Sequence, residues 1–261
     1  MDIIVGNEPS PGASFTEHTK NSVINYFWYC EENSDKSFQF TDLRKNISFE
    51  KKTNEKNDRC IWPLLKNLGF VNYQKGEMIN CSKVFTNKGI ALTKLFELEK
   101  NLNKNNIAKE RYDRILYFIK KAIEELIFNG LWHIVKDKKE EVSYSMVIIQ
   151  AIRFLIKYNS YDKKEFCYML YCFNKKISTD KVTNTVLKYR KNIIDFMVYA
   201  DTYDKKSGSA QNRKKTDISN ITCYGYISNL LEAAGIVKKV DKSRYELREE
   251  NKEKIQTFLY L

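Results

Sequence analysis

The stretch from Asn212 to Phe258 constrains the fold more than any other part of the chain. It begins with a basic run at 213–215, and Thr222 then offers the short hydroxyl side chain that favours a helix N-cap. From Tyr226 to Ala234 the apolar residues recur at helical spacing, and Gly235 follows where a C-terminal cap would lie. This pattern predicts a short amphipathic helix.

Two short β-type runs come next, at 236–240 and 244–247, joined by the polar turn Asp241-Lys242-Ser243. A helix, a tight hairpin and a closing helix together predict a winged helix-turn-helix, which sets one helix in the major groove of DNA and a basic hairpin on its backbone. The alternative is a plain helix packed on a hairpin. Basic residues at the helix start and in the hairpin favour the DNA-binding interpretation.

The first part of the chain repeats this order of elements. Three predicted helices come first, two β-type runs follow, and a fourth helix closes the set. In chain order these are a helix after the Thr16 cap, helices at 41–47 and 54–68, the second of which ends at Gly69, β-type runs at 70–73 and 81–85, and a helix from Lys88 after the Thr86 cap. We therefore predict a second winged helix here.

These two candidates divide the chain. Residues 1–14 contain two prolines and two glycines and predict an irregular lead-in, whereas a long amphipathic pattern at 107–129 predicts a connecting helix. We expect an N-terminal winged-helix subdomain over 1–106, a helical connector over 107–141, and a C-terminal helical and winged-helix subdomain over 142–261. The predicted fold class is mainly α with small β wings.

Within the C-terminal part, apolar spacing predicts helices near 144–158 and 163–173 and a third from the Ser178 and Thr179 cap to about Tyr199. The segment 201–216 is polar and basic, and we expect a loop that becomes ordered on phosphates. Nowhere does the sequence show strand–helix alternation, a phosphate-binding glycine loop or a nucleophile elbow.

The charge balance indicates a polyanionic partner. Lys and Arg number 45 against 33 Asp and Glu, which gives a net charge of +12. Double-stranded DNA is the partner we expect, although an AT-rich genome also inflates lysine content. No apolar stretch approaches the length of a membrane span, so we expect no membrane partner.

The six cysteines include no C-x-x-C pair, and the chain opens without a secretory signal. We therefore expect reduced thiols and a cytoplasmic, bacterial location. His18 and His133 are too far apart in sequence to indicate a zinc site. We expect no cofactor in this chain.

Five segments carry a family resemblance: RCIWPLLKNLGFV (59–71), VFTNKGIALTKLF (84–96), FIKKAIEELIFNGLWHI (118–134), VIIQAIRFLIKYNSYDKKEFCYML (147–170) and TCYGYISNLLEAAGIVKKVDKSRYEL (222–247). In this order the chain, from about residue 15 to 259, resembles the N-terminal DNA-recognition region of type IIS restriction endonucleases of the AlwI and BpuJI kind and the related nicking enzymes. The resemblance implies a monomer whose two winged helices clasp a short asymmetric duplex site.

In that family the nuclease is a separate C-terminal domain of the PD-(D/E)xK type, and only that domain needs Mg²⁺. The chain departs from the family by ending at Leu261, where a linker and nuclease would begin. We expect a recognition fragment or a stand-alone reader that is not catalytic alone. A winged-helix transcriptional regulator, which would dimerise on symmetric operators, and a protein–protein interaction module stay open as alternatives.

A complete small type II endonuclease is a further alternative, with a site around Asp195, Asp204 and Lys206. Such chemistry needs two carboxylates that hold Mg²⁺ and a nearby lysine. The apolar run 196–200 separates Asp195 from the Asp204-Lys205-Lys206 triplet. Similar triplets occur at four other places, and the spacing around Asp195 predicts a helix, so the chance explanation is favoured.

Candidate DNA contacts lie at the two predicted recognition helices and at the C-terminal wing. Lysine and arginine neutralise phosphates, whereas arginine favours guanine and asparagine favours adenine in the major groove. A solvated surface position is the alternative for each residue, and Arg59 and Arg213 are the two most favoured contacts. The candidates are Asn54, Lys56, Asn57 and Arg59; Arg213, Lys214 and Lys215; Thr222, Tyr224, Tyr226 and Asn229; and Lys238, Lys239, Lys242 and Arg244.

Overall fold

The computed structural model describes residues 1–6, 11–51, 55–74, 76–102, 107–136, 144–203 and 213–260. These ranges are mainly helical, with ten α-helices and small sheets of two or three strands. Two compact units are present. The N-terminal unit comprises Pro11–Asp137 with Asn229–Gly235, and the C-terminal unit comprises Met1–Ser10, Lys138–Ser228 and Ile236–Leu261.

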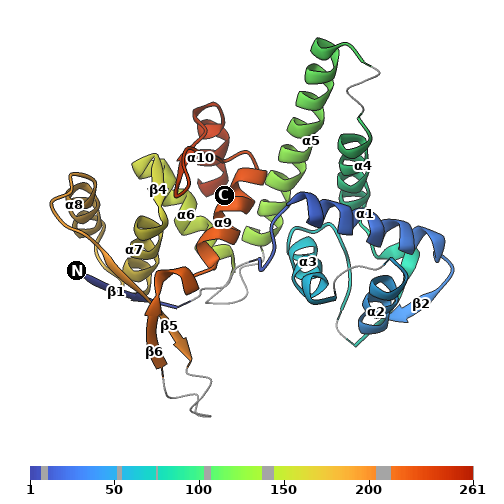
Figure 1. The fold of residues 1–261 in the computed structure, drawn as a ribbon, viewed down its shortest axis with the longest axis horizontal. Helices are drawn as coiled ribbons and strands as arrows, with labels where there is room; N and C mark the ends of the chain where they lie inside the picture. The colour runs from blue at the N-terminus through green and yellow to red at the C-terminus, as the bar shows by residue number, and fades with distance from the viewer. Residues whose placement is uncertain are drawn as a thin grey trace. The chain divides into compact units, whose positions relative to one another are not determined.

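The N-terminal unit contains five helices and a two-stranded antiparallel sheet among its described residues (Figure 1). In chain order they are α1 (Glu17–Glu32), β2 (Ser37–Gln39), α2 (Phe40–Glu50), α3 (Glu55–Asn67), β3 (Met78–Asn80), α4 (Asn87–Asn101) and α5 (Lys109–Lys136). The sheet pairs β2 with β3, and Phe38 lies opposite Ile79.

Local capping sets several helix ends where the sequence predicts them. The hydroxyl of Thr16 accepts a hydrogen bond from the Thr19 amide, and that of Thr86 accepts one from the Gly89 amide. Gly89 is required by packing, because a Cβ there would lie 1.9 Å from the Phe70 carbonyl oxygen. The first turn of α4 therefore packs directly on the backbone that follows α3.

An aromatic cluster around Trp62 forms the core of this unit. Trp62 is fully buried and stacks on Tyr26, with ring centroids 4.8 Å apart. Phe40 meets the Trp62 ring edge-on and stacks on Tyr73. The Tyr26 hydroxyl donates to buried Asp58, and burial raises the Tyr26 pKa far above its usual range.

The predicted hairpin of 70–73 with 81–85 forms only in part: its runs pair at one isolated antiparallel bridge between Val71 and Phe85, with backbone hydrogen bonds from Asn72 to Val84 and from Thr86 to Phe70. Asn80 is responsible, because its side chain accepts from the Ser82 amide and starts one turn of 3-10 helix at Cys81–Lys83. The second strand is therefore β3, and its partner is β2 instead of the run at 70–73.

The C-terminal unit contains two three-stranded sheets among its described residues. One is β1 (Asp2–Val5), β5 (Met197–Tyr203) and β6 (Arg213–Asp217); the other is β4 (Ser160–Asp162), β8 (Arg244–Leu247) and β7 (Val237–Lys239). Its helices are α6 (Tyr144–Tyr158), α7 (Lys163–Asn174), α8 (Thr179–Arg190), the start of α9 (Cys223–Ala233) and α10 (Lys252–Tyr260).

Three predictions in this unit differ from the structure. The helix expected to reach Tyr199 ends at Arg190, where Asn192 adopts a φ of 57° and the chain continues into β5. The expected loop at 201–216 begins and ends in strands, with Tyr203 opposite Arg213, whereas 204–212 lie outside the described residues. The expected lead-in forms β1, which pairs in parallel with β5 because Ile3 and Val5 are buried beside Val198 and Ala200.

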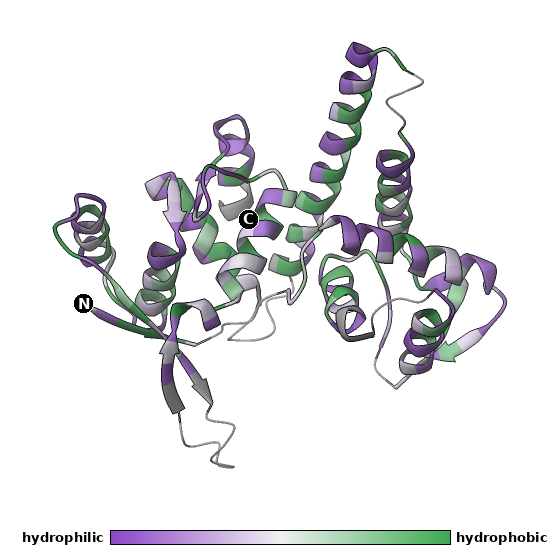
Figure 2. Cartoon of the chain, viewed as in Figure 1, coloured by the Kyte–Doolittle hydropathy of each residue, from purple (hydrophilic) through white to green (hydrophobic). Residues whose placement is uncertain are grey.

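The division into units also differs from the expected domain boundaries. Residues 1–10 lie in the C-terminal unit because β1 pairs with β5, and α5 lies in the N-terminal unit because its apolar stripe packs there. Hydrophilic and hydrophobic residues mix along each helix (Figure 2). No helix within the described ranges is long and apolar enough to cross a membrane.

Candidate nucleic-acid interface

Helix α3 is the first predicted recognition helix. Its core face carries Trp62, Leu64 and Leu65, which are fully buried, and Arg59 lies exposed near its start. Asn54 lies outside the described residues, and the structure describes only the backbone of Lys56 and Asn57. Of this group, Arg59 is thus the one residue with a described side chain, and it is accessible.

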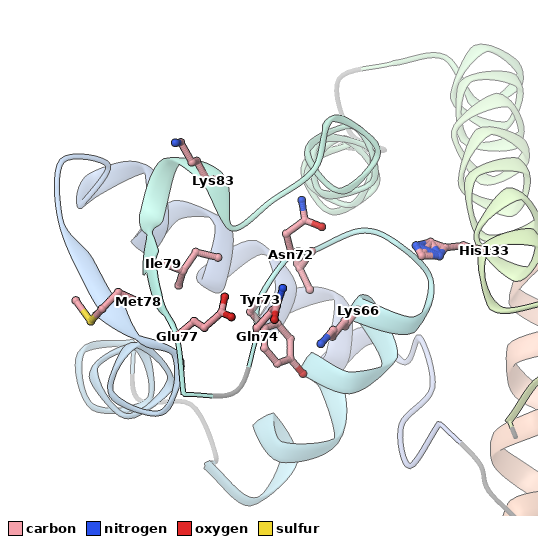
Figure 3. A pocket seen from close by; sticks show the side chains of 10 residues that line it. Lys66, Asn72, Tyr73, Gln74, Glu77, Met78, Ile79, Lys83 and His133 are labelled. Atoms are coloured by element: carbon pink, nitrogen blue, oxygen red, sulfur yellow. The ribbon is translucent and has the colours of Figure 1, made fainter. Parts of the chain in front are cut away.

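A cavity of about 680 Å³ lies beside the end of α3 (Figure 3). Its lining comes from α3, the segment after it, β3, the 3-10 turn and α5. The lining residues are Lys66, Val71, Asn72, Tyr73, Gln74, Glu77, Met78, Ile79, Lys83 and His133. Most are polar, so the cavity offers amide groups, cations and the carboxylate of Glu77 beside the apolar side chains of Val71, Met78 and Ile79.

Packing contacts hold several side chains at the edge of this cavity in place. The Lys66 ammonium lies 4.8 Å from the centre of the Tyr73 ring, and Phe40 stacks on Tyr73. Burial raises the pKa of the Tyr73 hydroxyl, which keeps it a neutral donor. His133 packs against Gly69, where an added Cβ would lie 2.6 Å from its ring. Gly69 has a φ of 73°, so both its conformation and its surroundings require glycine.

Sequence reasoning missed this group. Lys66 belongs to the helix predicted at 54–68, and Asn72 and Gln74 belong to the predicted hairpin around 70–85. The helix predicted at 107–129 stops short of His133, whereas α5 includes it. The polar composition of 72–77 was the available signal. Lys83 and His133 line the same cavity only because tertiary contacts bring together segments that are far apart in the chain.

The β7–β8 hairpin forms the predicted C-terminal wing. Lys238, Lys239 and Lys242 are exposed, and Val237 points inward. At the tip, the Asp241 carboxylate accepts hydrogen bonds from the amides of Ser243 (2.7 Å) and Arg244 (2.8 Å). The bond from Ser243 is the main cause of the lowered pKa of Asp241. The tip is therefore preformed, and cations lie along one strand and the turn.

Two predicted contact residues of this unit, Tyr224 and Arg244, make structural contacts within it. Tyr224 is buried against Tyr161, Phe166 and Tyr245, and its hydroxyl donates to the Ser243 carbonyl oxygen. Burial raises its pKa well above the usual range. Tyr224 belongs to the apolar face of α9, and this face packs into the core.

Arg244 is half-buried in an ion network. Its guanidinium lies 3.3 Å from the Asp162 carboxylate and 3.6 Å from that of Glu165, which also pairs with Arg190 at 2.5 Å. Glu165 is completely buried. Asp162 and Glu165 form the capping box of α7, so these carboxylates connect that helix to α8 and β8. The spacing of Asp162 and Glu165 in the sequence, D-x-x-E, is typical of a capping box.

The remaining candidates on α9 and β6 differ in exposure. Thr222 is exposed, and Tyr226 and Asn229 are half-buried. Lys215 is exposed on β6 opposite Asp201, with its ammonium 5.6 Å from the centre of the Tyr199 ring. The side chains of Arg213 and Lys214 are not described, but their backbone belongs to β6 rather than to a loop.

The alternative nuclease site has one described member. Asp195 lies just before β5, not in a helix, and its carboxylate is 2.6 Å from the Lys164 ammonium. This hydrogen bond is the largest cause of its lowered pKa. Asp204 and Lys206 lie outside the described residues. Within the described ranges, no group of three or more His, Cys, Asp and Glu side chains is placed to hold a metal ion.

Comparison with known proteins identified no matching family, curated protein or solved structure.

Proposed function

We propose that the chain binds double-stranded DNA and reads a short asymmetric site through two winged-helix units. The observation that carries this proposal is a strand pairing common to both units. In each, a strand directly after a long helix pairs with the last strand of the set: β2 with β3, and β4 with β8. A winged helix has this arrangement, and the helix before its wing is the one that enters the major groove.

The recognition helices of this proposal are α3 and α9. In the N-terminal unit the order is α1, β2, α2, α3 and β3. In the C-terminal unit it is α6, β4, α7, α9, β7 and β8, with α8, β5 and β6 inserted between the second and third helices. The insertion distinguishes the two units, so they would present different surfaces to the two halves of a site.

Exposed side chains at these elements have the chemistry of DNA contacts. Lys238, Lys239 and Lys242 on the wing suit phosphates, as does Arg59 on α3. Thr222, directly before α9, and Tyr226 and Asn229 within it are spaced as on one helix face and suit base edges. The cavity beside α3 adds Lys66, Asn72 and Gln74, a cation with two amides of the kind that recognise phosphate and adenine.

Unequal units favour a monomer on an asymmetric site over a dimeric regulator on a symmetric operator. This agrees with the resemblance to the recognition regions of type IIS restriction endonucleases. Binding in this proposal needs no metal ion, and cleavage belongs to a nuclease of the PD-(D/E)xK type.

Selection from a pool of random duplexes tests the proposal. The full chain is incubated with the pool at several salt concentrations, with and without Mg²⁺, and retained and cut sequences are determined. Enrichment of one short asymmetric sequence, with a binding affinity that falls steeply as the salt concentration rises, supports the proposal. A symmetric sequence bound by a dimer supports a regulator, and Mg²⁺-dependent cleavage supports the site at Asp195. No enrichment and no salt dependence would contradict DNA binding and favour a protein-interaction module.

A further inference from the structure

A second cavity, of about 450 Å³, lies among three helices of the C-terminal unit. Its lining comes from α6, α7, α8 and the connection between the last two, and none of the proposed DNA contacts lines it. Phe154, Met169 and Cys172 are each 5% exposed, and Ile177 and Val182 are half-buried. The cavity has the size of a small-molecule site and an apolar wall.

The rim of this cavity is cationic. Arg153, Lys157 and Lys176 all line it and are exposed, and no Asp or Glu is among the lining residues. Arg153 and Lys157 are four residues apart on α6 and so lie on the same face of that helix. An apolar wall beside several cations suits a ligand that has an apolar body and an anionic end.

Lys176 has a backbone conformation that its residue type does not favour. It follows α7 with a φ of 52°. Its amide donates to the Phe173 carbonyl, and the Ile177 amide donates to the Cys172 carbonyl. These bonds define a Schellman turn, whose left-handed position usually holds glycine or asparagine. The other described non-glycine residues with positive φ are Asn159 and Asn192.

A lysine therefore makes the turn less stable than glycine would. The requirements of the turn do not explain why a lysine occupies position 176. The Lys176 side chain does, however, place a cation at the cavity rim. An unfavourable backbone conformation of this kind is expected at binding sites.

We propose that this cavity binds a small aromatic carboxylate. The ring would lie against Phe154, Met169 and Cys172, because sulfur atoms and aromatic edges make favourable contacts with a ring face. The carboxylate would accept charge-assisted hydrogen bonds from the rim cations, chiefly Lys176. A highly charged phosphate ester would leave the apolar wall without a partner, so the wall selects against it.

The probe for this proposal is 2-naphthoate, compared with its neutral counterpart 2-naphthalenemethanol. Binding to the full chain is measured by calorimetry, and its location by NMR of the methionine methyl groups. Of the five methionines, only Met169 lines the cavity. We expect naphthoate to shift the Met169 methyl signal selectively and to bind roughly tenfold or more tightly than the alcohol.

The variant Lys176→Gly separates ligand binding from folding. It removes the cation and relieves the turn, so we expect affinity for naphthoate to fall roughly tenfold while thermal stability stays the same or rises. Lys175→Gln is the matched control, because Lys175 is exposed and outside the lining; its affinity should match the wild type. An unmoved Met169 signal, equal affinity for acid and alcohol, or undiminished binding by Lys176→Gly would overturn the proposal.

Discussion

The hydroxyl of Tyr224 donates a hydrogen bond to the carbonyl oxygen of Ser243, and this bond joins the first turn of α9 to the tip of the β7–β8 hairpin. The two residues belong to different elements of the proposed DNA reader. Their connection holds the β7–β8 hairpin in a defined position relative to the start of α9, the proposed recognition helix.

Tyr224→Phe should lower the free energy of unfolding by about 1 kcal/mol, because the ring remains packed and only the hydrogen bond is lost. Urea denaturation measures this loss. Tyr226→Phe, at a half-buried position on the same helix, should have a smaller effect. If both variants unfold alike, the bond to Ser243 contributes no specific stability.

Glu165→Ala should lower the free energy of unfolding by about 3–5 kcal/mol, because Arg190 and Arg244 then lose the buried carboxylate between them. Denaturation curves provide the measurement. Asp195→Asn is the comparison, since it breaks an exposed pair with Lys164 and should leave stability nearly unchanged. Equal effects of the two variants would contradict the importance of the buried network.

Gly89→Ala should destabilise the N-terminal unit by about 3 kcal/mol or more, because the new methyl group would meet the Phe70 carbonyl. Gly225→Ala should instead stabilise the protein by roughly 0.5–1 kcal/mol, since Gly225 lies within α9 and nothing lies within 4 Å of the added carbon. Thermal melting of the two variants should therefore change in opposite directions. A gain in stability for Gly89→Ala would show that α4 does not approach the Phe70 carbonyl so closely.

Replacing Lys238, Lys239 and Lys242 by glutamine should weaken DNA binding and reduce the salt slope by roughly 2–3, about 0.9 for each lost phosphate contact. Fluorescence anisotropy with a fixed duplex over a series of salt concentrations gives the slope. The matched control replaces Lys175, Lys181 and Lys188, which are exposed in the same unit. Equal slopes for both triple variants would assign the effect to net charge alone.

Burial raises the pKa of the Cys167 thiol to about 12 from its ordinary value near 9. The unfolded chain therefore releases this proton first, so the contribution of Cys167 to stability is complete below pH 9 and is lost as pH rises toward 12. Near pH 10 the loss should be roughly 1 kcal/mol. Cys167→Ala should be less stable at neutral pH but should lose less stability between pH 8 and 10. If the free energy of unfolding falls equally with pH in the wild type and in Cys167→Ala, Cys167 is not responsible for the loss.

Features set by neighbouring residues were predicted well from the sequence. The caps at Thr16 and Thr86, the end of α3 at Gly69 and the two strands of the C-terminal hairpin depend on side chains a few residues away. Of the candidate contacts predicted from the sequence, the wing lysines and Arg59 are exposed. The burial of Tyr224 and the ion network of Arg244 do not follow from the sequence, because their partners Tyr161 and Asp162 lie more than 60 residues away in the chain.

The sequence by itself determined the mainly helical class, most helix positions and the basic character of the chain, since helix periodicity, capping and charge are local or additive properties. Only the tertiary structure decided that β1 joins β5, that β3 joins β2, and that α8, β5 and β6 separate α7 from α9. It also decided which cations form ion pairs and which line the cavities. Strand partners and buried ion pairs form between residues far apart in the chain, so their free energies depend on how the whole unit closes.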